Sequence, residues 1–165
     1  MIENEVKYVL SLDCPELYGE KKKIIQQGYD NNGARLRKEN NTYSFNYKMK
    51  VDDFIEEFEM DISKEEFERG YTHCVNKLTK TRYTVKDEYK NTWDIDFFYS
   101  GDKLYFAMAE CEMADPTQEY PEKVIPIIEQ YCIFRVPRTE TRKFSSKKLS
   151  DVEYAKKMLE TIKTS

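Results

Sequence analysis

Charged side chains recur at alternate positions in short segments that otherwise have the composition of β-strands. The sets are Glu3, Glu5 and Lys7; Arg35 and Arg37; Lys48; Glu57 and Glu59; Lys80 and Arg82; Asp94 and Asp96; and Glu110 and Glu112. Side chains two residues apart in a strand point to the same face of a sheet. The sequence therefore predicts a sheet with one ionic face and one apolar face.

A solvated outer face is the ordinary explanation for alternating polar residues in antiparallel strands. Such a face usually mixes Thr, Ser, Gln and Lys, whereas here acid pairs and base pairs occupy separate strands. The acids and bases could neutralise one another. They could equally hold divalent cations and a polyanion side by side, which would make the surface a binding site.

The pattern of residues predicts eight strands and three helices. The expected strands are residues 2–10, 24–29, 34–39, 42–49, 55–62, 80–87, 92–99 and 103–113. Ser63 with Glu66 forms a capping-box pattern before a helix whose apolar stripe continues to Leu78. A second helix is expected over 122–131, where Pro126 is a potential kink, and a third after a capping-box pattern of Ser150 with Glu153.

Eight mostly antiparallel strands can close into a barrel, which removes exposed sheet edges. Helices with apolar stripes need an apolar surface to cover, so we expect the apolar face outside and the charged face inside. The predicted fold is an α+β protein with a closed eight-stranded antiparallel β-barrel, a charged lumen and helices packed on the outside. Because dry burial of so many charges would cost several kcal/mol for each ion, we expect a hydrated or ion-filled tunnel.

Length and composition indicate a single domain over residues 1–165. The four cysteines include no C-x-x-C pair, and the chain begins without an apolar signal segment, so we expect a soluble cytoplasmic protein with no membrane association. Net charge is −4, with the bases spread along the chain, which argues against tight non-specific binding of nucleic acid.

Several motifs occur in one order along the chain. They are Glu3-Asn4-Glu5-Val6-Lys7 (E-x-E-x-K), Gln27-Gly28-Tyr29, Arg35-Leu36-Arg37, Tyr43 to Lys48 with Asn46 where a Thr is usual, Glu57-Phe58-Glu59, Lys80-Thr81-Arg82-Tyr83, Asp94-Ile95-Asp96-Phe97, and Ala109-Glu110-Cys111-Glu112. With these motifs the chain resembles, over nearly its whole length, the CYTH domain of the triphosphate tunnel metalloenzyme superfamily. The resemblance implies a closed eight-stranded tunnel with charged residues inside.

The resemblance also implies roles for the charged residues. Glu3 and Glu5, with Glu110 or Glu112, would hold a Mg²⁺ or Mn²⁺ ion, and Glu57 and Glu59, with Asp96, would hold a second ion and orient the attacking water. The residues expected to bind the triphosphate are Lys7, Arg35, Arg37, Lys48, Lys80 and Arg82. The expected catalytic residues are Lys80, Glu57 and Glu59. Either Lys80 as a general base or a metal-bound water could supply the nucleophile, and the sequence leaves both open.

The function implied is metal-dependent hydrolysis of a small-molecule triphosphate: tripolyphosphate, a nucleoside triphosphate or thiamine triphosphate. The alternatives are a class IV adenylate cyclase, an RNA 5′-triphosphatase, and a non-catalytic polyphosphate- or nucleotide-binding protein. We expect the protein to be a monomer or a homodimer. One departure from the family pattern stands out. An acidic segment common in bacterial members is replaced by Arg135-Val136-Pro137, ahead of Phe144 to Leu149, so a glutamate expected there is missing.

Overall fold

The protein is built on one antiparallel sheet of nine strands with short helices on both of its faces. The computed structural model describes residues 4–16 and 21–165. The strands are β1 (Glu5–Leu10), β2 (Lys22–Tyr29), β3 (Arg35–Glu39), β4 (Thr42–Val51), β5 (Phe54–Asp61), β6 (Asn76–Lys86), β7 (Thr92–Ser100), β8 (Lys103–Glu112) and β9 (Cys132–Arg135). The helices are α1 (Lys64–Thr72), α2 (Pro126–Tyr131), the 3₁₀ helix η1 (Arg138–Phe144), α3 (Ser146–Leu149) and α4 (Val152–Thr164). The predicted α+β class is confirmed.

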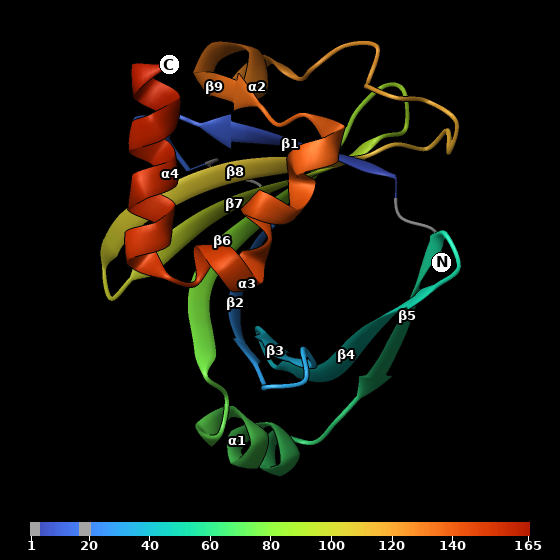
Figure 1. Cartoon of the computed structure of the whole chain (residues 1–165), viewed down its shortest axis with the longest axis vertical. Helices are drawn as coiled ribbons and strands as arrows, with labels where there is room; N and C mark the ends of the chain where they lie inside the picture. Colours follow the sequence, from blue (N-terminus) through green and yellow to red (C-terminus); the bar gives the residue numbers. More distant parts are fainter. Residues whose placement is uncertain (1–3, 17–20) are drawn as a thin grey trace.

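The sheet is strongly curved but open, so the prediction of a closed eight-stranded barrel is wrong (Figure 1). Its strand order is β5-β4-β3-β2-β6-β7-β8-β1-β9, and within the described residues the edge strands β5 and β9 do not pair with each other. The reason lies at β1. One edge of this strand pairs with β8, and the other edge, which closure by β5 would need, is taken by β9. The sequence pattern did not predict β9.

Strand register places the alternating charges opposite one another on the concave face. Lys7 lies across from Glu110, and Glu110 lies across from Asp94 on the next strand. Arg82 of β6 is opposite Asp96 of β7. Opposed side chains on one face are the closest neighbours in a sheet, so acids and bases of adjacent strands meet directly.

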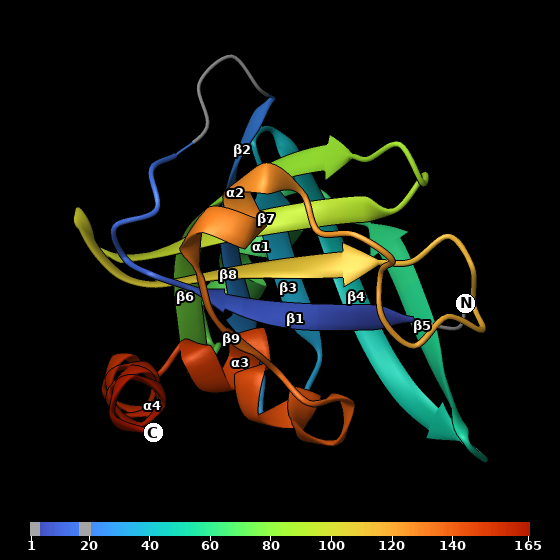
Figure 2. The same ribbon diagram turned by 90° about the horizontal axis from the view of Figure 1, so that it is seen from above.

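The convex face carries one of the two hydrophobic cores. Val6, Trp93, Ile95 and Cys111 alternate with the charged residues and are fully buried there, beneath α2, which contributes Ile128 (Figure 2). Helix α1 packs on the same face beside β2, β3 and β4. These two helices therefore lie outside the curve of the sheet, as expected.

The C-terminal helices lie on the opposite, concave face, which corrects the expectation that all helices pack outside. The inward-facing positions change from charged to apolar toward one end of the strands: Val9 follows Lys7, and Phe98 follows Asp96. Phe144, Leu149 of α3 and Leu159 of α4 pack against these residues. The C-terminal helices that carry this second core lie at one end of the concavity (Figure 1), and the charged residues line the rest.

The helix boundaries differ from the predicted ones where another residue supplies the cap or a strand competes. The Ser63–Glu66 capping box is confirmed, but α1 ends at Thr72 because residues 76–86 pair with β2 and β7 instead of continuing the helix. Asp151, rather than Ser150, caps α4. Pro126 begins α2 instead of kinking it. In the part of the chain that is described, every helix is too short or too polar to cross a membrane.

Gly28 of β2 allows α1 and the segment after it to approach the sheet closely. A Cβ atom at this position would lie 2.8 Å from both Cβ and Sγ of Cys74, where ordinary contacts are longer. We expect Gly28→Ala to lower the free energy of unfolding by about 1 kcal/mol or more, because overpacking costs about 1–3 kcal/mol and the gain in strand propensity returns only about 0.5–1 kcal/mol.

Urea denaturation monitored by circular dichroism would measure this change. The control Val75→Ala alters a residue that is 61% exposed and should stay within about 0.5 kcal/mol of the wild type. A Gly28→Ala protein at least as stable as the wild type would show that Cys74 can move away without cost.

Candidate functional site

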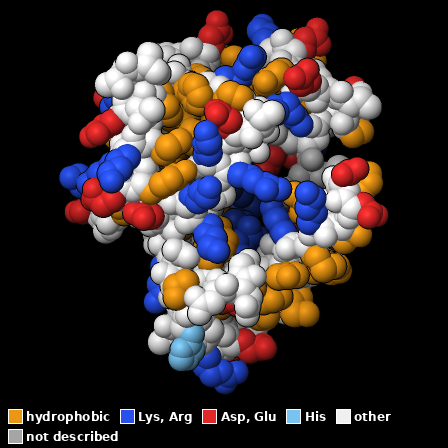
Figure 3. All heavy atoms as spheres, viewed as in Figure 1, with side chains coloured by type: hydrophobic (Ala, Val, Ile, Leu, Met, Phe, Trp, Pro, Cys, Tyr) orange, Lys and Arg blue, Asp and Glu red, His pale blue; other side chains and the backbone are white. Residues whose placement is uncertain are grey.

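The concave face encloses a cavity of about 360 Å³ whose walls are almost entirely polar. It brings together ten of the residues predicted for the site: Glu5, Lys7, Arg35, Arg37, Lys48, Glu57, Glu59, Lys80, Arg82 and Glu110. These ten side chains come from six strands, β1, β3, β4, β5, β6 and β8, and Tyr29 of β2 also lines the cavity. The space-filling view shows Lys and Arg side chains gathered around this hollow (Figure 3).

Of the other predicted residues, Asp96 and Glu112 do not line the cavity. Asp96 lies behind its wall, fully buried. Glu112 is at the end of β8, where its Oε1 accepts a hydrogen bond of 3.1 Å from the backbone nitrogen of Asn4. Glu3 lies outside the described residues. Their expected roles as metal ligands stay predictions.

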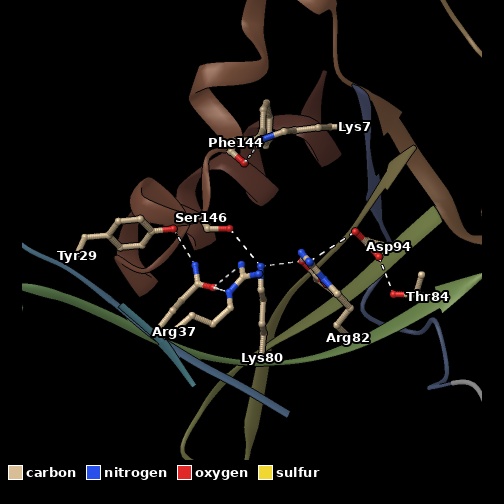
Figure 4. A network of polar contacts seen from close by, with 11 residues as sticks. Lys7, Tyr29, Arg37, Lys80, Arg82, Thr84, Asp94, Phe144 and Ser146 are labelled. Carbon is tan, nitrogen blue, oxygen red and sulfur yellow. Dashed lines mark hydrogen bonds and ion pairs between the residues drawn. The ribbon is translucent and has the colours of Figure 1, made fainter. Parts of the chain in front are cut away.

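Asp96 holds together the two basic residues of β6. Its Oδ2 lies 2.8 Å from Lys80 Nζ, and Arg82 donates to both of its oxygens, from Nε at 2.7 Å and from Nη2 at 2.8 Å (Figure 4). Burial alone would raise the pKa of Asp96, but Arg82 and Lys80 outweigh burial and hold that pKa well below its usual range. Such a bidentate, charge-assisted contact fixes the guanidinium plane.

Lys80 is a fully buried amine at the floor of the cavity. Besides its ion pair with Asp96, its Nζ lies 3.3 Å from Ser146 Oγ and 5.3 Å from the centre of the Phe98 ring. Burial is the largest cause that lowers the pKa of Lys80 to about 8; Arg82 and Arg37 act in the same direction, and Asp96 opposes them. A lysine near this value exchanges its proton close to neutral pH.

Gln27 positions Arg37 from beneath the cavity. Its Oε1 accepts hydrogen bonds from Arg37 Nε at 3.0 Å and Nη2 at 2.8 Å, and its Nε2 donates to Tyr29 Oη at 2.7 Å (Figure 4). Burial, together with Arg35 and Arg82, lowers the pKa of Arg37 to about 10. The guanidinium groups of Arg35 and Arg37 on β3 and of Arg82 on β6 therefore line one cavity, with β2 between the two strands.

Asn46 joins the two acids of the opposite wall. Its Nδ2 donates a hydrogen bond to Glu57 Oε1 and lies 3.4 Å from Glu59 Oε2. Asn46 is buried, and it stands opposite Glu59 in the pairing of β4 with β5. Sequence reasoning noted Asn46 only as a departure from the usual Thr. Its place in the alternating pattern, two residues before Lys48, was the signal that could have identified it.

A segment far away in sequence completes the cavity. Ser145, Ser146 and Lys147 line it from the start of α3, and the carbonyl oxygen of Phe144 accepts a hydrogen bond of 3.1 Å from Lys7 Nζ. Asp94 also lines the cavity and pairs with Arg82 Nη1 at 3.5 Å. Asp94 belonged to the predicted charged face without an assigned role, whereas residues 145–147 carry no charge alternation that could have indicated them.

The carboxylates of the cavity suit a hard divalent cation, although they do not form a complete cage. Across residues 4–16 and 21–165, no three acidic, histidine or cysteine side chains converge as a ready-made metal site. Mg²⁺ usually takes one or two carboxylates, water and substrate phosphates instead of an all-protein cage. Glu5 and Glu110 on one side and Glu57 and Glu59 on the other therefore fit an ion that arrives with a phosphate ligand.

Comparison with solved structures shows what the fold is similar to. No protein-family model matches the sequence, and no curated protein matches it. The inorganic triphosphatase NE1496 is 21% identical, with a TM-score of 0.61 over 90% of this chain and 97% of that one. A Bacillus halodurans protein described as a candidate adenylate cyclase is 15% identical, with a TM-score of 0.60 over 87% of this chain and 98% of that one. At these identities the likeness concerns the fold alone.

The ion pairs of Asp96 should make stability sensitive to acid. A carboxylate whose pKa is depressed on folding stabilises the native state fully above its unfolded pKa of about 3.9, and this contribution is lost as the pH falls below that value. We expect Asp96→Asn to lower the free energy of unfolding by about 3–5 kcal/mol at pH 7, since Lys80 and Arg82 would keep buried charges without their partner.

Urea unfolding of both proteins at a series of pH values in metal-free buffer would test this. The difference between wild type and Asp96→Asn should narrow as the pH falls below about 4, because the carboxylate of Asp96 takes up a proton there in the unfolded chain but stays ionised in the native protein. A difference that stays constant across the series would contradict the assigned ion pairs.

Proposed function

Because the chain has the fold of the CYTH, or triphosphate tunnel metalloenzyme, superfamily, we propose that it hydrolyses a small-molecule triphosphate and releases the terminal phosphate with the help of Mg²⁺ or Mn²⁺. The substrates considered are inorganic tripolyphosphate, a nucleoside triphosphate and thiamine triphosphate. The inorganic triphosphatase NE1496 has this fold, which favours tripolyphosphate as the first substrate to test.

The observation that carries the proposal is the charge composition of the cavity. Its described lining holds seven cationic side chains and five carboxylates: Lys7, Arg35, Arg37, Lys48, Lys80, Arg82 and Lys147, with Glu5, Glu57, Glu59, Asp94 and Glu110. A surplus of cations within so small a space needs an anion, and a triphosphate supplies several negative charges in a line. The remaining carboxylates have the donor type that Mg²⁺ and Mn²⁺ prefer.

The arginines are arranged to bind phosphate oxygens. Arg35 keeps a buried Nε without a hydrogen-bond partner among the described residues, although buried donors are nearly always paired. Arg37 and Arg82 are fixed by Gln27 and Asp96, so their outward-facing nitrogens are held in place before a ligand arrives. Preorganised donors of this kind stabilise the charge that spreads over phosphoryl oxygens in the transition state.

We assign to Lys80 the binding of the terminal phosphate or the acceptance of a proton from the attacking water. Its Nζ is fixed by Asp96 and Ser146 at the floor of the cavity, close to the second core. Glu57 and Glu59 face it from the hairpin wall, and Asn46 orients both carboxylates. A water molecule between these walls would lie between the amine of Lys80 and the carboxylates of Glu57 and Glu59.

The divalent ion would lie between the carboxylates and the phosphate chain. Glu5 and Glu110, on the adjacent strands β1 and β8, and Glu57 and Glu59 of β5 are the residues that would hold it. When bound, the ion would neutralise charge on the phosphate oxygens and orient them for in-line displacement. Asp94 is engaged with Arg82 and Thr84, so we assign it to positioning Arg82.

An adenylate cyclase is the second candidate, because the Bacillus halodurans protein with this fold carries that description. A cyclase must bind a nucleobase and direct the ribose hydroxyl to the α-phosphate. Among the residues that the structure describes, the cavity lining offers one aromatic side chain, Tyr29, and its hydroxyl is bonded to Gln27. This lining favours hydrolysis over cyclisation, and a binding protein without turnover would have little need for five carboxylates beside a polyanion.

The reactions are distinguished by their products. Purified protein would be incubated with tripolyphosphate or ATP, each with Mg²⁺ or Mn²⁺, and all products separated by chromatography. We expect phosphate release, and we expect Arg35→Ala to reduce kcat by about 10²–10³-fold because one preorganised donor to the transferred phosphoryl group is lost.

Lys38→Ala is the matched control, since Lys38 is on the same strand but on its opposite face, against Tyr43. Its activity should stay within about twofold of the wild type, because it removes no cavity residue. Pyrophosphate with cyclic AMP from ATP would establish the cyclase instead. Binding of tripolyphosphate without any product would leave a non-catalytic binding protein.

Removal of divalent ions should abolish turnover and leave the fold intact. We expect protein treated with a chelator to release no phosphate and to recover activity on addition of Mg²⁺ or Mn²⁺. Glu5→Gln, which keeps the shape of the side chain but removes its charge, should lower activity at least about tenfold through weakened metal affinity, an effect typical of altered metal-site residues. Calorimetry should still detect tripolyphosphate binding by this variant, and full activity in the chelator would contradict the metal requirement.

A further inference from the structure

The outer face of the hairpin formed by β4 and β5 is apolar and lies open to solvent. Six large side chains form this hairpin patch: Tyr47 (37% exposed), Met49 (43%), Val51 (41%), Phe54 (52%), Phe58 (52%) and Met60 (59%). In the space-filling view, hydrophobic side chains gather over this part of the molecule (Figure 3). Most large apolar residues elsewhere on the sheet are buried by a helix.

The patch follows from the same alternation that builds the cavity. Lys48, Glu57 and Glu59 face inward, so the residues between them must face outward. Helix α1 reaches this face only at the start of β4, where Phe67 lies 5.4 Å from Tyr43. Beyond Asn46, β4 has left its pairing with β3, and the hairpin extends past the rest of the sheet (Figure 2).

The size of the hairpin patch is near what a specific interface needs. A large apolar or aromatic side chain has roughly 150–250 Å² of surface, so six of them at about half exposure present about 500 Å². This is at the upper end of what monomeric proteins expose. Two such patches in contact would bury about 1,000 Å² in total, which is the lower limit for a specific protein–protein interface.

We propose that the hairpin patch packs face to face against the same patch of a second copy of this chain, forming a two-fold symmetric homodimer. A two-fold interface is self-complementary, and two apolar sheet faces pack well as layers of a sandwich. The outer face of the hairpin carries a single charge, Glu56, which stands opposite Met49 and between Phe54 and Phe58 on the edge strand β5, so the rest of the face is apolar.

The distribution of acids argues against the other occupants. Pairing of two β5 strands edge to edge, with the two-fold axis at Phe58, would place Glu57 of one copy beside Glu59 of the other, and like charges directly opposite destabilise a sheet. An anionic membrane would be repelled by Asp52 and Asp53 at the tip of the hairpin. Packing of the faces avoids the conflict between the two β5 strands, because Glu57 and Glu59 then stay on the cavity side.

The dimer would also support the cavity wall. Asn46, Lys48, Glu57 and Glu59 are all carried by a two-stranded hairpin whose outer half has no other neighbour in the sheet. An isolated two-stranded ribbon is marginally stable in water. A second copy against its outer face would hold these side chains at a fixed distance from the cations on the other wall.

Sedimentation velocity and light scattering of the wild type over about 1–200 µM protein would test the proposal, because oligomerisation depends on concentration. We expect a dimer that dissociates on dilution. Phe58→Lys places a charge at the centre of the hairpin patch and should weaken dimerisation at least about 100-fold, as truncation or disruption of a central anchor does. The matched control Val75→Lys changes an exposed residue outside the hairpin and should leave the dimer intact.

Hydrogen–deuterium exchange of the wild type gives a second readout that needs no variant. Amides of residues 47–60 should exchange more slowly at high protein concentration than at low concentration. A wild type that is monomeric over the whole range, with the same exchange at both concentrations, would overturn the proposal. A dimer that survives in a correctly folded Phe58→Lys protein would also overturn it, because the interface would then lie elsewhere.

Discussion

The buried carboxylate of Asp96 is the interaction on which the rest of the concave face depends. Three strong contacts fix Lys80 and Arg82 to it, and all three side chains lie on two adjacent strands. An ion pair in such a place does not need to increase stability relative to apolar residues of the same size. The effect of the ion pair is geometric: Asp96 holds the side chains of Lys80 and Arg82 in fixed positions at the floor of the cavity. Without this carboxylate, both side chains would be free to move.

The concave face of the sheet has an ionic part and an apolar part. The apolar part holds the C-terminal segment against the edge of the cavity. Val9 and Phe98 follow the charged residues of their strands and pack with Phe144 and Leu149. This core brings the start of α3 over the cavity, so that Ser146 reaches Lys80 and the Phe144 carbonyl reaches Lys7. Hydrophobic packing of a distant segment therefore supplies polar groups that no strand provides.

The sequence was sufficient to predict eight of the nine strands and the face on which their described charges lie, because a period of two is a local property that strand pairing preserves. The sequence could not predict whether the sheet closes, because closure depends on which segment pairs with the second edge of β1. That segment is β9, and a strand of four residues is too short to show a recognisable alternation. The predicted site residues lie together in the cavity for the same local reason. Asp96 and Glu112 are exceptions: both lie on the predicted face of their strands, but Asp96 is buried behind the cavity wall and Glu112 stands at the end of β8, and alternation encodes neither position.

The cations of the cavity repel one another. Burial and the nearby Arg35 and Arg82 lower the pKa of Arg37, so its surroundings disfavour the charged form. Folding alone gives no reason to assemble cations in this way, because like charges in a confined space weaken the compact state. Under the proposed function a polyanion would remove this repulsion, and binding to the native state alone would shift the folding equilibrium toward it. Under this proposal, binding of the polyanion would recover the folding stability that repulsion among the cations costs. The affinity for the polyanion would therefore rise with the amount of repulsion that it removes.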